Sequence, residues 1–287
     1  MSPTDLRVLR EATLAHVLAG AAGGSRFEAS GVLAAGGCLW VAFDNLPDLA
    51  RISLDWTVPD AAAGMIRQPG GPTGFEDLAA DPDGERYFGV LEGVDRGDGH
   101  RYSQIVVFDH RWREVDRQWT DIRLIEPNKG LEGLAAVRRH GRLHLLGLAE
   151  GPVDVAATRT PGVPGRLHVL VEVDGQWRTR HTVALPESVR FGDYSAVALD
   201  GSRLAVLSQE SSALWVGSLH PHRWRVLDDG RTYRFPRSAQ GRICYGTVEG
   251  AAWLDDRRLV VVSDRAKHGA PQRIRDKDQS IHVVELP

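Results

Sequence analysis

Residues 130–151 read GLEGLAAVRRHGRLHLLGLAEG and contain two apolar segments joined by a short polar turn. The turn RRHG ends in glycine, which is typical of a tight connection between antiparallel strands. The second segment is strongly apolar and finishes in Glu150. This stretch therefore predicts a β-hairpin whose second strand is buried and ends in a polar residue.

The hairpin pattern occurs five times along the chain. Its other copies are EASGVLAAGGCLWVAFDN (28–45), GFEDLAADPDGERYFGVLEG (74–93), DYSAVALDGSRLAVLSQESS (193–212) and VEGAAWLDDRRLVVVSDRAK (248–267). Third strands are expected at LARISLD, SQIVVFD, GRLHVLVEV, SALWVGSL and QSIHVVEL, and fourth strands at REVDRQWT and WRTRHTVAL. Units of four short strands that recur every 46 to 63 residues are typical of propeller blades.

We therefore expect an all-β fold, a five-bladed β-propeller with four-stranded antiparallel blades, formed by residues 1–287 as a single domain. The last repeat stops after its third strand at Pro287. The N-terminal segment around Leu6 to Leu18 is expected to supply the missing strand and close the ring, which would protect its open edge. Three long irregular stretches join second to third strands, at residues 92–101, 150–165 and 264–278. We expect all three on the face where the first strands begin.

The bulk composition excludes several classes of protein. The chain carries 35 basic and 38 acidic residues, so it lacks the clearly basic balance of a nucleic-acid-binding protein. Two cysteines, Cys38 and Cys244, cannot form a disulfide framework or a zinc site by themselves. We find neither a secretory signal at the start nor an apolar run of membrane-spanning length. A soluble cytoplasmic protein, with no nucleic-acid or membrane partner, is expected.

One column of residues stands out when the five first strands are aligned. These equivalent positions, called the ring residues below, are Ser30, Glu76, Glu132, Ser195 and Glu249. First strands of a propeller each project one residue into the channel at a given depth, so equivalent positions form a ring. Glycine follows the column residue in three of the five strands, as expected where backbones crowd around a narrow axis.

Three carboxylates brought together away from bulk water repel one another unless a cation joins them. Calcium accepts 6–8 oxygen ligands in flexible geometry, and glutamates with hydroxyls and waters would suit it. Zinc, copper and iron fit poorly because the ring contains no histidine or cysteine. We predict a Ca²⁺ ion here rather than Mg²⁺. The alternative is that the glutamates bond to backbone N–H groups or arginines and bind no metal.

The order Ser, Glu, Glu, Ser, Glu on five first strands resembles the calcium-dependent soluble apyrases. That resemblance implies a five-bladed nucleotidase with a central calcium ion. The chain is also similar to uncharacterised bacterial propellers of the phytase-like esterase and SdiA-regulated groups. These share the EGLA-type first strand seen at Glu132–Ala135 and, loosely, at Glu249–Ala252. The resemblance supports the fold and the cation more than a particular reaction.

Polar residues end the second strand of every repeat. These rim residues are Asp44, Asn45, Glu92, Glu150, Gln209, Glu210, Asp264 and Arg265. They are expected to surround the channel mouth, where they would contact a substrate or water. The alternative is that strands simply end at solvent, where polar residues are ordinary.

Basic residues gather in the segment 264–278, DRAKHGAPQRIRDKD. Beside a cation site, Arg265 and Lys267 could hold a phosphate or carboxylate, although interleaved aspartates favour a self-neutralising loop. Lys129, three residues before Glu132, is a further candidate for the mouth.

Three functions are compatible with these patterns. The first is a calcium-dependent hydrolase acting on a phosphate ester or phosphoanhydride. In it Glu92 or Glu150 would act as general base, and Arg265 or Lys267 would stabilise negative charge. Asp44, Asn45, Lys129, Gln209 and Asp264 would then contact a small, anionic substrate. The second is a non-catalytic binding propeller with a structural calcium ion. The third is a biosynthetic isomerase or cyclase that uses the metal as a Lewis acid.

Overall fold

The computed structural model describes residues 4–19, 26–68, 70–151, 153–155, 166–189 and 191–287. This part of the chain is dominated by strands, with two four-residue α-helices and one 3₁₀ turn. The first two groups of consecutive antiparallel strands are β3 (Ala29–Ala35), β4 (Cys38–Phe43), β5 (Leu49–Ser53) and β6 (Gly64–Ile66), then β7 (Phe75–Ala80), β8 (Tyr87–Asp95), β9 (Arg101–Phe108) and β10 (Glu114–Leu124).

The remaining strands continue the pattern. They are β11 (Leu131–Arg139), β12 (Arg142–Ala149), β14 (Arg166–Val173) and β15 (Gln176–Ala184), then β16 (Ala196–Asp200), β17 (Arg203–Ser208), β18 (Ala213–Ser218) and β19 (Arg231–Arg234), and finally β20 (Val248–Trp253), β21 (Arg258–Ser263) and β22 (Ser280–Glu285). A single parallel bridge, Thr120↔Trp177, joins β10 to β15 and merges two groups into one larger sheet. The short strand β13 (Val153–Val155) pairs with β10.

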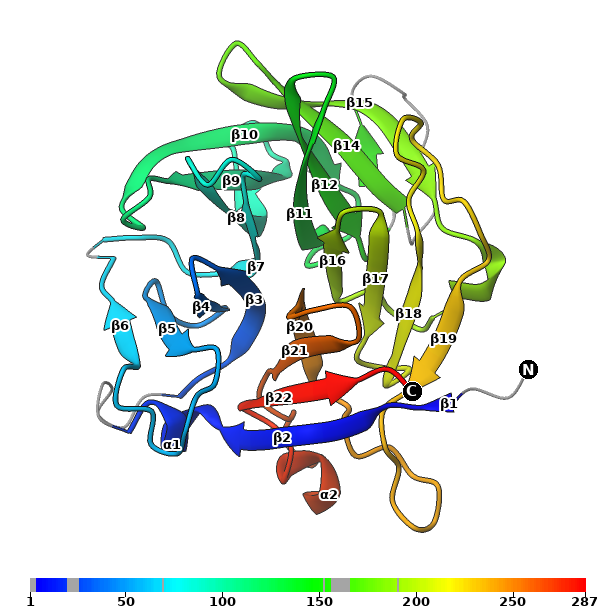
Figure 1. Cartoon of the computed structure of the whole chain (residues 1–287). Helices are drawn as coiled ribbons and strands as arrows, with labels where there is room; N and C mark the ends of the chain where they lie inside the picture. The colour runs from blue at the N-terminus through cyan, green and yellow to red at the C-terminus, as the bar shows by residue number, and fades with distance from the viewer. Residues whose placement is uncertain (1–3, 20–25, 69, 152, 156–165, 190) are drawn as a thin grey trace.

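The strand that begins each repeat lies innermost, which gives an all-β, propeller-like arrangement (Figure 1). These inner strands are β3, β7, β11, β16 and β20. Each contacts the next along the chain, and β20 contacts β3, so the contacts form a closed ring. Because the inner strands run in the same sense, their first residues meet at one end of the channel and the hairpin turns meet at the other.

The N-terminal segment closes the structure, as expected, but only part of it is a strand. β2 (Arg7–Thr13) pairs antiparallel with β22, and β1 (Thr4–Asp5) pairs parallel with β19 (Figure 1). The chain then forms a short helix, α1 (Leu14–Val17), rather than extending the strand to Leu18. Its apolar residues Leu14, Val17 and Leu18 are one turn apart and fully buried against β3, β4 and β5, and this burial favours the helical turn.

The three long connections differ in form. β8 continues to Asp95, so the first connection is a hairpin loop of residues 96–100. The connection 264–278 contains the helix α2 (Gln272–Arg275). In the connection 150–165, residue 152 and residues 156–165 lie outside the described part. No helix among the described residues has the length and apolarity needed to cross a membrane. Both cysteines are free thiols.

Candidate metal centre and channel mouth

A β-bulge positions four of the five ring residues. Phe75 pairs with Leu91 and Asp77 pairs with Val90, so Glu76 between them has no partner on β8. The same register shift leaves Ser30, Glu132 and Glu249 without partners on β4, β12 and β21. A bulge turns the extra residue away from the regular alternation and re-aims its side chain. The same β-bulge in four inner strands thus places these side chains at equivalent positions.

The residues that follow the bulges set how closely the inner strands approach. A Cβ atom on Gly133 would lie 2.6 Å from the backbone N of Val197, and one on Gly31 would lie 2.6 Å from the Cα of Asp77. Only glycine fits such contacts between backbones. At the equivalent position of β7, the Asp77 carboxylate accepts a hydrogen bond of 2.8 Å from the Leu134 N–H on β11.

The three ring glutamates share one electrostatic environment. The pKa values of Glu76, Glu132 and Glu249 are all raised well above the ordinary value, first by burial and then by neighbouring carboxylates. Glu76 contributes to the shift of both other glutamates. Each side chain keeps some solvent exposure even though protein atoms surround it, as expected for groups that line a narrow opening. The charge of Glu76 therefore destabilises the charged forms of Glu132 and Glu249.

The two ring serines bridge to neighbouring inner strands. The Ser30 hydroxyl donates to the Phe75 carbonyl on β7, and the Ser195 hydroxyl donates to the Val248 carbonyl on β20 at 3.2 Å. Both side chains are buried. A hydroxyl that donates its proton keeps lone pairs that can face a cation.

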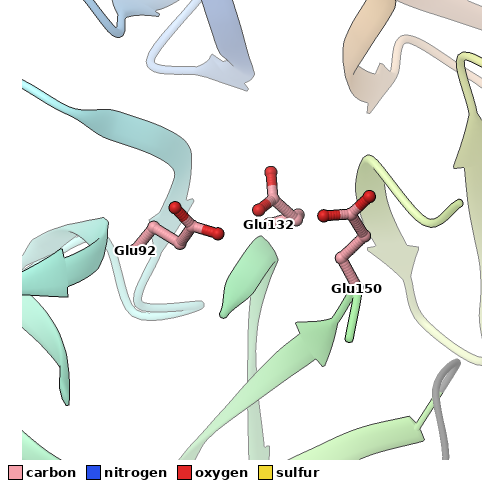
Figure 2. Close-up of side chains that lie close together, drawn as sticks. All are labelled: Glu92, Glu132 and Glu150. Atoms are coloured by element: carbon pink, nitrogen blue, oxygen red, sulfur yellow. The ribbon is translucent and has the colours of Figure 1, made fainter. Parts of the chain in front are cut away.

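Two rim carboxylates converge on one ring carboxylate (Figure 2). Oxygen atoms of Glu92, Glu132 and Glu150 all lie within 4.8 Å of one another. Glu92 also accepts a 2.8 Å hydrogen bond from the Gly130 N–H, which ties β8 to the start of β11. This cluster mixes ring and rim positions, which the alignment of the sequence had kept separate.

Two further rim carboxylates lie beside Glu249. Asp264 and Asp44 both raise the pKa of Glu249 after burial. The pKa of Asp264 is itself raised to about 6, chiefly by burial, and its Oδ1 atom is buried without a hydrogen-bond partner among the described residues. The Gln209 side chain hydrogen-bonds to Glu249 and opposes the rise in its pKa. Rim residues from different second strands thus reach the ring.

Few positive charges reach this carboxyl cluster. Lys129 Nζ lies 2.5 Å from Glu150 Oε1, and the pKa of Lys129 is raised by this hydrogen bond. Burial still raises the pKa of Glu150 despite the lysine. Arg265 Nη1 lies 3.5 Å from Glu28 at the exposed edge. One lysine and one peripheral arginine do not balance the acidic groups collected here.

Other candidate residues have different surroundings. Asn45 fixes the local backbone, because it accepts from the Glu28 N–H at 3.3 Å and donates to the Arg26 carbonyl at 3.2 Å. Lys267 is exposed. In the same segment Arg273 donates to the Ile243 carbonyl at 2.9 Å, and Lys277 pairs with Glu11 on β2. Arg273 and Lys277 therefore tie this segment to other parts of the chain.

Three acidic residues near the mouth were not selected from the sequence. Glu28 contributes to the raised pKa values of Asp44 and Asp264, and Asp193 contributes to that of Glu150. Asp77 bridges two inner strands. Glu28 and Asp193 each precede a ring serine by two residues, and this shared spacing is a signal that could have identified them.

Comparison with known proteins supports the fold alone. No family model and no curated protein matches the chain. The PQQ-bound aldose sugar dehydrogenase from Streptomyces coelicolor superposes with a TM-score of 0.52 at 14% identity, over 99% of each chain. Glutaminyl cyclase from Myxococcus xanthus gives a TM-score of 0.47 at 12% identity, over 99% of this chain and 98% of that chain. The first of these propeller-like enzymes is similar to this chain in fold, and the architecture seen in Figure 1 is accordingly propeller-like.

Proposed function

We propose that this chain is a five-bladed propeller, with four-stranded blades, that binds a calcium ion at one end of its channel. The observation that carries the proposal is a set of seven carboxyl groups: oxygen atoms of Glu92, Glu132 and Glu150 lie within 4.8 Å of one another, and the other four interact electrostatically with the ring glutamates or belong to them. Those carboxyl groups are Asp44, Glu76, Glu92, Glu132, Glu150, Glu249 and Asp264. Repulsion within such a group is relieved when a cation binds.

The donor set suits a hard cation. Carboxylate and hydroxyl oxygens are the preferred ligands of calcium, which tolerates irregular geometry and up to eight ligands. The ring residues Ser30, Glu76, Glu132, Ser195 and Glu249 would hold the ion from the channel side. Glu92 and Glu150, which converge with Glu132, lie beside this set at the mouth.

We further propose that the mouth hydrolyses a phosphate ester or phosphoanhydride, a chemistry consistent with the resemblance of the ring order to the soluble apyrases. A bound calcium ion would supply positive charge to a phosphoryl oxygen. The chain itself would orient the substrate and accept a proton from the attacking water. Glu150 suits that second role, because its carboxylate lies at the mouth beside Glu92 and Glu132. Lys129 donates a hydrogen bond to Glu150 and would hold it in place.

One observation favours a non-catalytic binding protein with a structural ion as the second candidate. Of the two basic side chains expected to hold a substrate anion, Arg265 already pairs with Glu28 at 3.5 Å, and Lys267 is exposed. A site whose arginine is already paired has less charge to offer a phosphate. In that case calcium would stabilise the fold without turnover.

Calcium binding is tested first by thermal melting in EDTA, in excess calcium and in excess magnesium, with isothermal titration of the metal-free protein. The parent should melt higher in calcium than in EDTA, with a smaller effect of magnesium. Glu132→Gln should weaken calcium binding at least tenfold, because Glu132 belongs to both ring and rim clusters. Glu126→Gln, on an exposed residue, is the matched control. Equal melting in EDTA and calcium would contradict the cation site.

Hydrolysis is tested separately with a panel of phosphate monoesters, diesters and nucleoside polyphosphates. Glu150→Gln should lower turnover at least a hundredfold in protein that still melts higher with calcium. If the parent binds calcium and hydrolyses none of the panel, the hydrolase proposal fails and the binding-protein candidate stands.

A further inference from the structure

A cavity of about 560 Å³ lies at the end of the channel where the inner hairpins turn. It is lined by the later residues of the inner strands, and none of the ring or rim residues belongs to its wall. A volume of this size lies within the range that accommodates small-molecule ligands. The cavity is therefore a space distinct from the carboxyl cluster.

A ring of apolar side chains, called the apolar collar, lies between the cavity and the carboxyl cluster. It consists of the residues two positions after each ring residue, which are Val32, Leu78, Leu134, Val197 and Ala251. These side chains are 1% to 4% exposed. Below them the wall continues with Ala34, Ala80, Ala136, Leu199 and Trp253. A molecule in the cavity therefore meets an apolar surface and is kept apart from the proposed cation.

One cation in the cavity wall has no acidic partner. Arg139, at the end of β11, is 9% exposed, and among the described residues its polar contacts are the carbonyls of His220 at 2.8 Å and Arg223 at 3.3 Å. Its guanidinium lies 3.9 Å from the ring centre of Trp224. The neighbouring Arg138 differs, because it pairs with Asp81 and Asp83. Burying an arginine without a counter-ion is costly, so an anion is expected beside Arg139.

The charged groups around Arg139 are basic as well. The charged neighbours that lower the pKa of His220, after burial, are arginines and a histidine: Arg225, Arg223, His222 and Arg139. The same holds for His144, whose pKa is lowered by burial, Arg139, Arg142 and His181. His144 and His181 also contact the Trp224 ring. The wall also contains Asp200, which pairs with Arg203, so among the described residues the charge left without an opposite partner here is basic and favours an anion.

We propose that this cavity is a second ligand site, which binds a small monoanion with an apolar body, its carboxylate paired with Arg139 and its hydrocarbon part in the channel. A guanidinium has five N–H donors, and two are used by the carbonyls. Those remaining can hold a carboxylate through two parallel hydrogen bonds. The hydrocarbon part of the ligand would pack against the apolar wall.

Octanoate, used below its micelle concentration, is the probe, with acetate and 1-octanol as partial ligands. Isothermal titration of the full chain in saturating calcium should show octanoate binding at least tenfold more tightly than either. Acetate lacks the apolar body, and octanol lacks the charge. Octanol binding as tightly as octanoate would overturn the role of Arg139, and no octanoate binding would overturn the site.

Two variants separate the charge from the cavity. Arg139→Gln should weaken octanoate binding at least tenfold, whereas Arg180→Gln, on an exposed arginine of β15, should leave it unchanged. Ala136→Phe fills the cavity while keeping the arginine, and should abolish binding. If Arg139→Gln does not fold, Ala136→Phe still tests whether octanoate binds in the cavity. Unchanged octanoate affinity in either folded variant contradicts the proposal, and calcium binding should persist in both.

Discussion

The carboxylate of Asp77 on β7 accepts a hydrogen bond from the Leu134 N–H on β11, with 2.8 Å between Oδ2 and the nitrogen. Its other oxygen accepts from the Leu78 N–H at 2.8 Å. Asp77 is buried, and this burial raises its pKa well above the ordinary value even though both hydrogen bonds favour the charged form. One side chain thereby connects two inner strands directly behind the ring residues.

Asp77→Ala should destabilise the protein by about 1–3 kcal/mol, because the Leu134 N–H is left buried without a partner. Urea denaturation of the calcium-free protein measures the loss. Asp55→Ala, on an exposed aspartate, is the control and should stay within about 0.5 kcal/mol of the parent. Equal effects of the two substitutions would show that the connection contributes nothing.

Gly133→Ala should destabilise the protein by about 1–3 kcal/mol, since the new Cβ would lie 2.6 Å from the Val197 backbone nitrogen and one inner strand would have to move. The same denaturation experiment applies. Gly64→Ala is the comparison, because a Cβ at Gly64 meets no atom within 4 Å. A parent-like Gly133→Ala protein would mean that the inner strands separate without cost.

Lys129→Met should tighten calcium binding about three- to tenfold, because it removes a positive charge that acts on Glu150 and Glu132. The metal-free protein should become less stable, as the carboxylates lose their nearby cation. Titration with calcium at low ionic strength measures the first effect. Arg180→Met, an exposed charge on β15, should change calcium affinity little. Unchanged calcium affinity in Lys129→Met would place the ion away from this cluster.

The pairing of the N-terminal strand should give stability that depends on pH. Contacts with His282 lower the pKa of Glu11 to about 2, and further contacts with Lys277 and Tyr245 act in the same direction against partial burial. A lowered carboxyl pKa stabilises the folded state above the unfolded value of 4.5, and this contribution is lost as pH falls from 4.5 towards 2.

Glu11→Gln should therefore be less stable than the parent at pH 7, and the difference should shrink as pH falls through that window. Melting temperatures measured from pH 7 to pH 2.5 follow it, with Glu126→Gln as a control that shows no such trend. A difference that stays constant with pH would assign the effect of Glu11→Gln to lost packing rather than to charge.

Local patterns in the sequence were enough to locate the first three strands of each repeat and to align the ring, but they did not locate the fourth strands β6 and β19. Each repeat alternates an apolar run, a turn with glycine or aspartate and a second apolar run, and hairpins form at these places because turn chemistry and side-chain alternation act over a few neighbouring residues. The column Ser30, Glu76, Glu132, Ser195 and Glu249 follows from the same periodicity, since equivalent residues of equivalent strands lie at one depth.

Only the tertiary structure decided which side chains meet. Glu92 and Glu150 converge with Glu132 because β8 and β12 return to the start of β11. Arg139, a residue of the cavity wall, donates to the carbonyls of His220 and Arg223 because loop 219–226 packs over its hairpin. The N-terminal segment ends its strand at Thr13 because Leu14, Val17 and Leu18 bury as one helical turn. These contacts join residues far apart in the chain, so they depend on how sheets pack together, and local sequence does not encode that packing.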